Sequence, residues 1–226
     1  VGIWLGDGSG GFTKTETTAW GGNSRGLDSA DFNHDGNIDL VRGRYSSGYI
    51  DVHWGDGTGA FPTSTYLGDV GTDPYGVVAG DFDNDGHPDV FANYGSNGDT
   101  YFFKGNGDGT FAAPVYEATL DTGRHGGFDA YDYNGDGNLD VVIATYNYDR
   151  LFYYPGNGNA TFGTPVEIGS VGNTVFGISA MPLPAPAGRP VADIVPAAPA
   201  PIAEGGSVDF DGSGSTDSDG TVSAWA

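Results

Sequence analysis

The chain of 226 residues contains no cysteine and few basic residues, with 8 Lys plus Arg against 30 Asp plus Glu. The absence of cysteine excludes disulfides, a thiol nucleophile and cysteine metal sites. The formal net charge of -22 disfavours nucleic acid and anionic membrane surfaces as partners, because both are negatively charged. Apolar runs of about 18 residues, which a membrane-spanning helix needs, are also missing, so we expect no membrane insertion. This composition favours cations as partners.

Glycine, proline and aromatic residues are abundant by contrast. The sequence has 41 Gly and 13 Pro, and 13% of its residues are aromatic. Glycine at this level disfavours long helices, and the apolar content is too high for a disordered acidic tail. We therefore predict an all-β protein that is rich in turns.

An acidic segment of nine residues recurs with a period of about 50 residues. Its three copies begin at Asp31, Asp81 and Asp132, and each begins five residues after a glycine. A period of this length is typical of propellers and solenoids.

A glycine-rich turn that ends in phenylalanine is the second recurring feature, at residues 6–12, 55–61, 105–111 and 156–162. Asp-Gly and Asn-Gly steps between alternating apolar segments predict β-hairpins, because both central turn residues need positive φ. The two features together predict four strands in each repeat. In the second repeat these strands are residues 76–80, 89–94, 100–104 and 111–118.

Four-stranded antiparallel sheets repeated in this way predict β-propeller blades, since neighbouring sheets can bury each other's faces. The predicted partial propeller covers residues 1–183 and divides into a half blade (1–19), three full blades (20–69, 70–119 and 120–170) and the first strand of a further blade (171–183). Residues 184–203 are rich in Pro and Ala, which is typical of an extended linker. Residues 204–226 are too few to bury a core of their own.

The acidic segment has the composition of a metal-binding loop. Positions 1, 5 and 9 are Asp, position 3 is Asp or Asn, and glycine at position 6 permits the tight curl that turns these oxygens inward. All-oxygen coordination suits Ca²⁺ better than Mg²⁺ or Zn²⁺, and an EF-hand would need Glu at position 12, where the chain has Arg42, Ala92 and Ile143. Asp-Gly runs can also be solvated turns without metal. Three copies at matched spacing favour about three structural calcium sites.

These repeats resemble the FG-GAP/VCBS family of calcium-loop propeller blades over about residues 1–180, most closely at 81–118. The resemblance implies calcium ligands at positions 1, 3, 5, 7 and 9 of each segment, with position 7 acting through its backbone carbonyl. The implied ligands are Asp31, Asn33, Asp35, Asn37 and Asp39 in the first copy, Asp81, Asp83, Asp85, His87 and Asp89 in the second, and Asp132, Asn134, Asp136, Asn138 and Asp140 in the third.

The tail at residues 204–226 resembles the beginning of a PKD domain, of which about a third is present. Both resemblances imply an exported protein of bacterial type, either secreted or on the cell surface.

Tyrosines recur after the second predicted strand of the repeats, at Tyr45, Tyr94 and Tyr146, with Tyr148 nearby. Aromatic rings in equivalent loops can stack on sugars or contact a protein partner, so these four residues are predicted to bind a ligand. The alternative interpretation is that they pack between blades.

Catalytic patterns are not evident, because the histidines lack metal-ligand spacing and no G-x-S-x-G motif occurs. The sequence therefore predicts a calcium-binding, non-catalytic module for extracellular adhesion or for recognition of a protein or carbohydrate ligand. The alternative is an accessory segment of a secreted polysaccharide-degrading enzyme or peptidase whose catalytic domain lies outside this chain.

Overall fold

The structure is a computed structural model, and it describes residues 2–16, 23–45, 47–69, 74–94, 98–119, 125–145, 150–170, 178–179, 195–196 and 210–211. The chain divides into two units, Val1–Ala180 and Met181–Ala226. Every regular element within the described residues is a β-strand, which confirms the all-β prediction. A helix long and apolar enough to cross a membrane does not occur in this described part.

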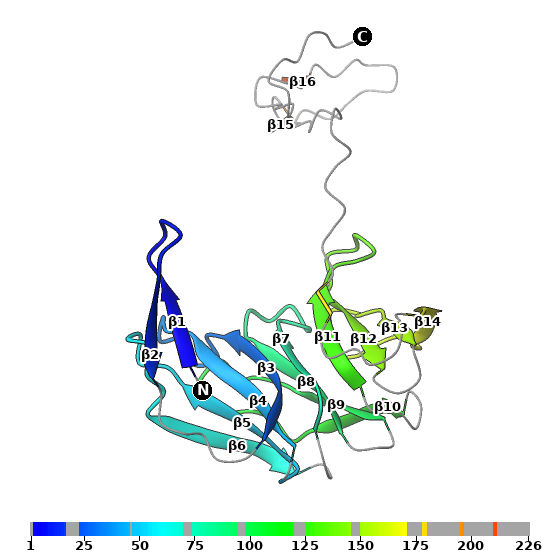
Figure 1. Cartoon of the computed structure of the whole chain (residues 1–226). Coiled ribbons are helices and arrows are strands. Elements are labelled where there is room, and N and C mark those ends of the chain that lie inside the picture. The colour runs from blue at the N-terminus through cyan, green and yellow to red at the C-terminus, as the bar shows by residue number, and fades with distance from the viewer. Residues whose placement is uncertain are drawn as a thin grey trace. The chain divides into compact units, whose positions relative to one another are not determined.

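Three four-stranded antiparallel sheets make up most of the first unit (Figure 1). The first sheet contains β3 (Ser24–Ala30), β4 (Asp39–Arg44), β5 (Tyr49–Trp54) and β6 (Thr63–Asp69). The second contains β7 (Val77–Gly80), β8 (Asp89–Tyr94), β9 (Asp99–Phe103) and β10 (Val115–Thr119), and the third contains β11 (His125–Tyr131), β12 (Asp140–Thr145), β13 (Leu151–Tyr154) and β14 (Val166–Gly169). In each sheet the strands pair in chain order, as expected for a propeller blade. A separate hairpin pairs β1 (Gly2–Gly6) with β2 (Phe12–Glu16).

The outermost strand of each sheet begins directly after a proline. In the second sheet β10 begins at Val115, after Pro114, and not at residue 111 as the sequence suggested. Phe111 instead forms an isolated bridge with Gly105 that closes the glycine turn. Proline has no N–H to donate to a strand ladder, so Pro114 separates this bridge from the strand. Proline precedes β6 and β14 in the same way.

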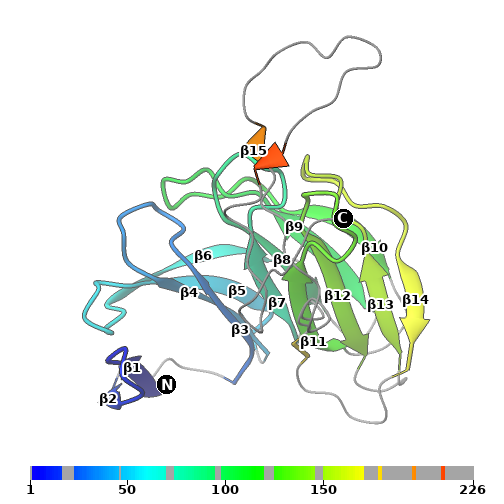
Figure 2. The same ribbon diagram turned by 90° about the horizontal axis from the view of Figure 1, so that it is seen from above.

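The sheets pack face to face through two apolar clusters. The first cluster joins Val41, Ile50 and Val52 of the first sheet to Val90, Ala92, Tyr94 and Phe103 of the second. The second cluster joins Val78, Phe91 and Phe102 of the second sheet to Val141, Ile143 and Tyr154 of the third. Successive residues of a strand point to opposite faces, so the second sheet buries one face against each neighbour. Figure 2 shows the three sheets side by side.

The first strands of the three sheets approach one another closely, β3 against β7 and β7 against β11. A Cβ atom at Gly26 would lie 2.6 Å from the backbone nitrogen of Val77, and one at Gly76 would overlap the ring of Phe128. Gly26 and Gly76, which precede the first two acidic segments by five residues, thus permit close packing of these strands. Asp28 adds a polar link, because its Oδ2 accepts a hydrogen bond of 2.8 Å from the N–H of Ala79.

The second unit is described only at β15 (Val195–Pro196) and β16 (Phe210–Asp211), which pair antiparallel. The rest of the predicted linker (184–203) and of the PKD-like segment (204–226) lies outside the described residues. Of the predicted further strand at 171–183, only residues 178–179 are described.

Candidate functional site

The three acidic segments form the connections between the first and second strands of the three sheets. In each loop the Asp at position 1 accepts hydrogen bonds from the backbone N–H groups of positions 5 and 6. In the first loop Asp31 accepts from Asp35 at 3.1 Å and from Gly36 at 2.9 Å, and the other two loops repeat this pattern at Asp81 and Asp132. The chain can curl in this way because the glycine at position 6 has positive φ, which is 86° at Gly36.

The Asp at position 9 is fully buried in each loop, at Asp39, Asp89 and Asp140. One carboxylate oxygen accepts a hydrogen bond of 3.0 Å from the N–H of position 2, and the other accepts one of 2.8 Å from the first glycine of the glycine turn. This aspartate therefore joins the two recurring features of the sequence. The sequence predicted this aspartate only as a metal ligand. Its fixed spacing of 16 residues from that glycine is the signal that could have revealed the second role.

The second loop brings three carboxylates together. One oxygen from each of Asp81, Asp83 and Asp89 lies within 4.8 Å of the others, and no other group of three such residues was found among the described residues. The pKa of Asp89 is raised to about 7, mainly by burial and to a smaller extent by the nearby charge of Asp83. In the first and third loops the residue at position 3 is Asn33 or Asn134, which offers an amide oxygen instead of a carboxylate.

A lysine distinguishes the second loop from the other two. The ammonium group of Lys104 contacts the carboxylate of Asp83 and lies 2.6 Å from Oδ2 of Asp85. Trp54 and Pro155 occupy the equivalent position, directly before the glycine turn, in the first and third sheets. Lys104 therefore balances part of the negative charge of this loop alone.

Neighbouring loops are linked from position 4 of one to position 7 of the next. The ring nitrogens His34 Nε2 and His87 Nδ1 lie 2.8 Å apart, and Asn84 Nδ2 donates to Asn138 Oδ1 at 2.8 Å. The side chains of His87 and Asn138 thus form hydrogen bonds to the preceding loop. That position 7 offers a metal its backbone carbonyl stays a prediction.

The predicted ligand-binding tyrosines differ in their surroundings. Tyr94 is only 1% exposed and belongs to the cluster between the first two sheets, so the prediction of a ring presented to solvent is corrected here in favour of packing between blades. Tyr45 is partly buried, stacks edge to face on Tyr75, and has the guanidinium of Arg25 4.0 Å from its ring centre. Tyr146 and Tyr148 lie outside the described residues.

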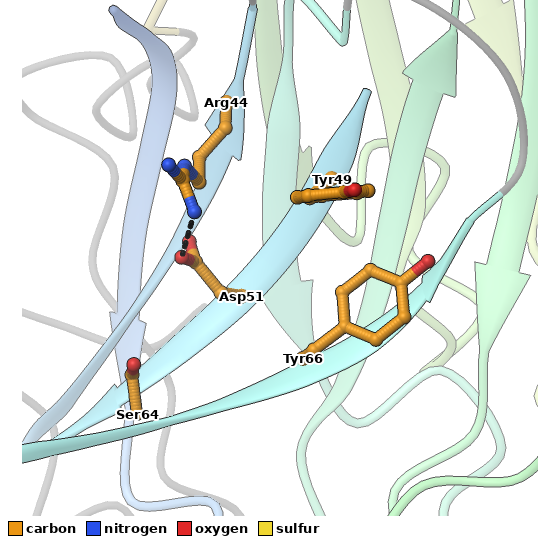
Figure 3. A pocket seen from close by; sticks show the side chains of 5 residues that line it. All are labelled: Arg44, Tyr49, Asp51, Ser64 and Tyr66. Atoms are coloured by element: carbon orange, nitrogen blue, oxygen red, sulfur yellow. Dashed lines mark ion pairs between the residues drawn. The ribbon is translucent and has the colours of Figure 1, made fainter. Parts of the chain in front are cut away.

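A pocket that the sequence analysis did not predict lies on the first sheet (Figure 3). It has a volume of about 410 Å³ and is lined by Arg44, Tyr49, Asp51, Ser64 and Tyr66, from β4, β5 and β6. Beneath it, Arg42 donates to both carboxylate oxygens of Asp51, at 2.8 and 3.0 Å. Burial alone would raise the pKa of Asp51, but the nearby imidazole of His53 and the hydrogen bonds from Arg42 outweigh it and hold the pKa below its ordinary value.

Alignment of the repeats with one another shows the sequence signal of this pocket. Arg42 and Arg44 occupy the β4 positions that hold Ala92 and Tyr94 in β8. Charged residues in one repeat, at positions that face an apolar cluster in another, indicate that this face of the first sheet is not packed like the equivalent face of the second sheet.

Comparison with solved structures identifies similar folds. A lectin from Agrocybe aegerita, described as recognising non-reducing terminal N-acetylglucosamine, has 19% sequence identity and a TM-score of 0.54, over 75% of this chain and 46% of the lectin. The chain thus spans about half the length of that lectin. A BBS1N–ARL6DN complex matches with 15% identity and a TM-score of 0.45, over 70% of this chain and 47% of the other. At 19% identity the likeness to the lectin shows the fold alone. No curated protein matches the sequence.

A family model described as FG-GAP-like repeat matches the chain three times, at residues 31–92, 85–143 and 132–183. Together these matches cover more than half of the sequence and include all three acidic loops. The chain therefore belongs to the family of FG-GAP-like repeat proteins.

Proposed function

We propose that this β-propeller ligand-binding module is stabilised by calcium and recognises an extracellular ligand, a protein or a carbohydrate, without catalysing a reaction. The single observation that carries the proposal is the second acidic loop, where oxygens of Asp81, Asp83 and Asp89 lie within 4.8 Å of one another. The FG-GAP-like repeats and the fold of the lectin support a non-catalytic recognition module.

The donor set of the loops fits calcium. The side chains of positions 1, 3, 5 and 9 offer only carboxylate and amide oxygens, and Ca²⁺ takes six to eight such ligands in flexible geometry. The residues that would hold the ions are Asp31, Asn33, Asp35 and Asp39, Asp81, Asp83, Asp85 and Asp89, and Asp132, Asn134, Asp136 and Asp140, together with the carbonyls of Asn37, His87 and Asn138.

Calcium would act on the fold by offsetting repulsion between the clustered carboxylates. Two like charges 4 Å apart repel by about 1 kcal/mol even in water, and the buried Asp89 is less well screened. With a Kd of about 0.1 mM, which is typical of extracellular sites, millimolar calcium would stabilise the folded chain by about 1.4 kcal/mol per loop. Because the carboxylate at position 9 accepts a hydrogen bond from the glycine turn, calcium would also stabilise the hairpin formed by the last two strands of each sheet.

The proposed setting is a secreted or cell-surface protein that acts in adhesion or recognition. The strong acidity of the chain suits an environment rich in divalent cations. We also propose that residues 204–226 belong to a PKD-like domain.

A glycan array with and without calcium tests the proposed function. The proposal predicts binding to a defined set of glycans in calcium and weaker binding in EDTA, because the loops would lose their order. If no glycan binds under either condition, carbohydrate recognition is excluded and a protein ligand becomes the remaining form of the proposal. Binding that is equally strong in both conditions would contradict the role of calcium.

A further inference from the structure

One face of the first sheet differs from the equivalent faces of the other two. Val41, Ile50 and Val52 point into the cluster shared with the second sheet. Because successive strand residues alternate between faces, the intervening Arg42, Asp51 and His53 lie on the opposite face, which is turned away from the second sheet.

The register of the strands identifies the equivalent positions in each sheet. Arg42 pairs with Asp51 across β4 and β5. In the second and third sheets the equivalent cross-strand pairs are Ala92 with Tyr101 and Ile143 with Phe152. Ala92, Tyr101 and Ile143 belong to the apolar clusters that pack against the preceding sheet. An ion pair therefore replaces apolar contacts at this place in the first sheet alone.

Such a substitution makes this face a poor surface for packing another sheet. Burying charged groups in an apolar interface is costly unless every group is paired. A face with fixed charges, two tyrosines and a pocket is instead suited to a polar ligand, because ligand sites combine aromatic walls with a few well-placed polar groups.

The described charged groups at the pocket carry a charge opposite in sign to that of the chain. Among the residues that the structure describes there, the guanidinium groups of Arg42 and Arg44 lie beside the carboxylate of Asp51, so the formal charges of these three groups sum to a positive value while the whole chain carries -22. Arg42 occupies both oxygens of Asp51. The Nη1 atom of Arg44 is 3.9 Å from the carboxylate of Asp51, which is beyond hydrogen-bond distance. The Nε atom of Arg44 has no hydrogen-bond partner.

Two tyrosines form the wall beside Arg44. Tyr49 and Tyr66 stack edge to face with ring centres 4.9 Å apart, and they are 36% and 50% exposed. Figure 3 shows the guanidinium of Arg44 on one side of the pocket, the two rings on the other, and Ser64 at its end. A volume of about 410 Å³ lies at the small end of the range for ligand pockets, which suits one or two sugar rings.

We propose that this pocket binds an acidic saccharide, with the anionic group on Arg44 and the sugar ring against Tyr49 and Tyr66. The inference rests on the proposed function and names its ligand class and its site. The guanidinium provides paired donors for a carboxylate or a sulfate, and the tyrosine rings cover the apolar face of the sugar. The hydroxyl group of Ser64 can exchange hydrogen bonds with sugar hydroxyls.

Isothermal titration with matched glycosides tests the proposal at a fixed millimolar concentration of calcium. Methyl β-D-glucuronide and methyl β-D-glucoside differ only in the carboxylate, and methyl glucoside 6-sulfate carries the other anion. We expect one or both anionic sugars to bind about 10- to 100-fold more tightly than the glucoside, which is the effect of a charge-assisted hydrogen bond. The stronger of the two identifies the anion.

Three variants locate the site. Arg44→Gln should remove the preference for the anionic sugar, and Tyr66→Ala should weaken the binding of all three glycosides. Arg150→Gln is the matched control, because Arg150 is an exposed arginine of the third sheet beside Glu167; it should change nothing. Melting curves of each variant check that the fold is intact.

Several results would overturn the proposal. These are equal affinity for glucoside and glucuronide, an anionic preference that persists in Arg44→Gln, and no binding of any glycoside at about 10 mM. Equal or tighter binding of an N-acetylated, amidated aspartate would instead assign the pocket to an acidic peptide. A calcium-dependent hit on the glycan array that Arg44→Gln leaves unchanged would preserve the proposed function and exclude this pocket as its site.

Discussion

Replacing the ion pair between Arg42 and Asp51 with the equivalent pair of the third sheet tests how the first sheet is built. The two exchanges are Arg42→Ile and Asp51→Phe, which copy Ile143 and Phe152. Arg42 is 2% exposed and Asp51 is 6% exposed, so each single exchange leaves a buried charge without its main partner. Removing one partner of a buried pair typically costs about 3–5 kcal/mol.

The structure predicts which single variant is less stable. After Arg42→Ile, Asp51 keeps His53 at 3.5 Å and Arg44 at 3.9 Å, so the loss should be near 3 kcal/mol. After Asp51→Phe, Arg42 keeps a hydrogen bond of 3.1 Å to the neutral hydroxyl group of Ser24, and the loss should be near 5 kcal/mol. In a unit of this size these losses correspond to a decrease in Tm of about 6–20 °C.

The double variant should recover most of the lost stability, because apolar pairs often replace buried ion pairs without loss. Urea unfolding followed by tryptophan fluorescence, in constant calcium, gives the four free energies of the cycle. A double variant less stable than both single variants would refute the reasoning, and so would single losses below about 1 kcal/mol.

Three further predictions concern packing, metal competition and pH. Gly26→Ala should reduce the free energy of unfolding by about 1–3 kcal/mol, because its Cβ would lie 2.6 Å from the backbone of Val77. Gly169→Ala, where an added Cβ would meet no atom within 4 Å, should change that free energy by less than about 0.5 kcal/mol. Equal effects of the two variants in urea unfolding would contradict the close packing of β3 on β7. Lys104→Met should tighten calcium binding at the second loop by about 2- to 30-fold, since two partly exposed ion pairs compete with the metal there; unchanged affinity in a calcium titration would show that lysine and metal do not compete. In EDTA the Tm should fall as the pH rises from about 4 to about 8. The pKa of Asp89 is raised to about 7, so the folded chain binds this proton more tightly than the unfolded chain and loses the resulting stabilisation as the proton leaves. Saturating calcium should abolish that fall, and an equally steep fall in Asp89→Asn would assign it to other groups.

The repeats and the hairpins could be predicted from the sequence because their signals are local. Glycine at fixed positions reports positive φ, and alternating apolar residues report strands. The predicted second strand of the second repeat, residues 89–94, coincides with β8. The predicted fourth strand began four residues early, because the bridge between Gly105 and Phe111 belongs to the turn and the strand starts only after Pro114.

The site could be predicted only where its residues are close in sequence. The acidic loops are continuous segments, so their spacing was visible at once. The burial of Tyr94 depends on which sheet covers it, and the contact of Arg42 with Asp51 depends on the register of two strands. Sequence alone does not say which face of a strand meets a neighbouring sheet, and for that reason the pocket beside Arg44 was missed.

Counting bound calcium is the most direct test of the account. Isothermal titration of the metal-free chain should give about three calcium ions per chain with a rise in Tm, and Asp81→Ala combined with Asp85→Ala should reduce the count to about two. A metal-free chain that takes up no calcium, and that melts at the same temperature in EDTA and in millimolar calcium, would contradict the claim that the acidic loops bind calcium and stabilise the sheets.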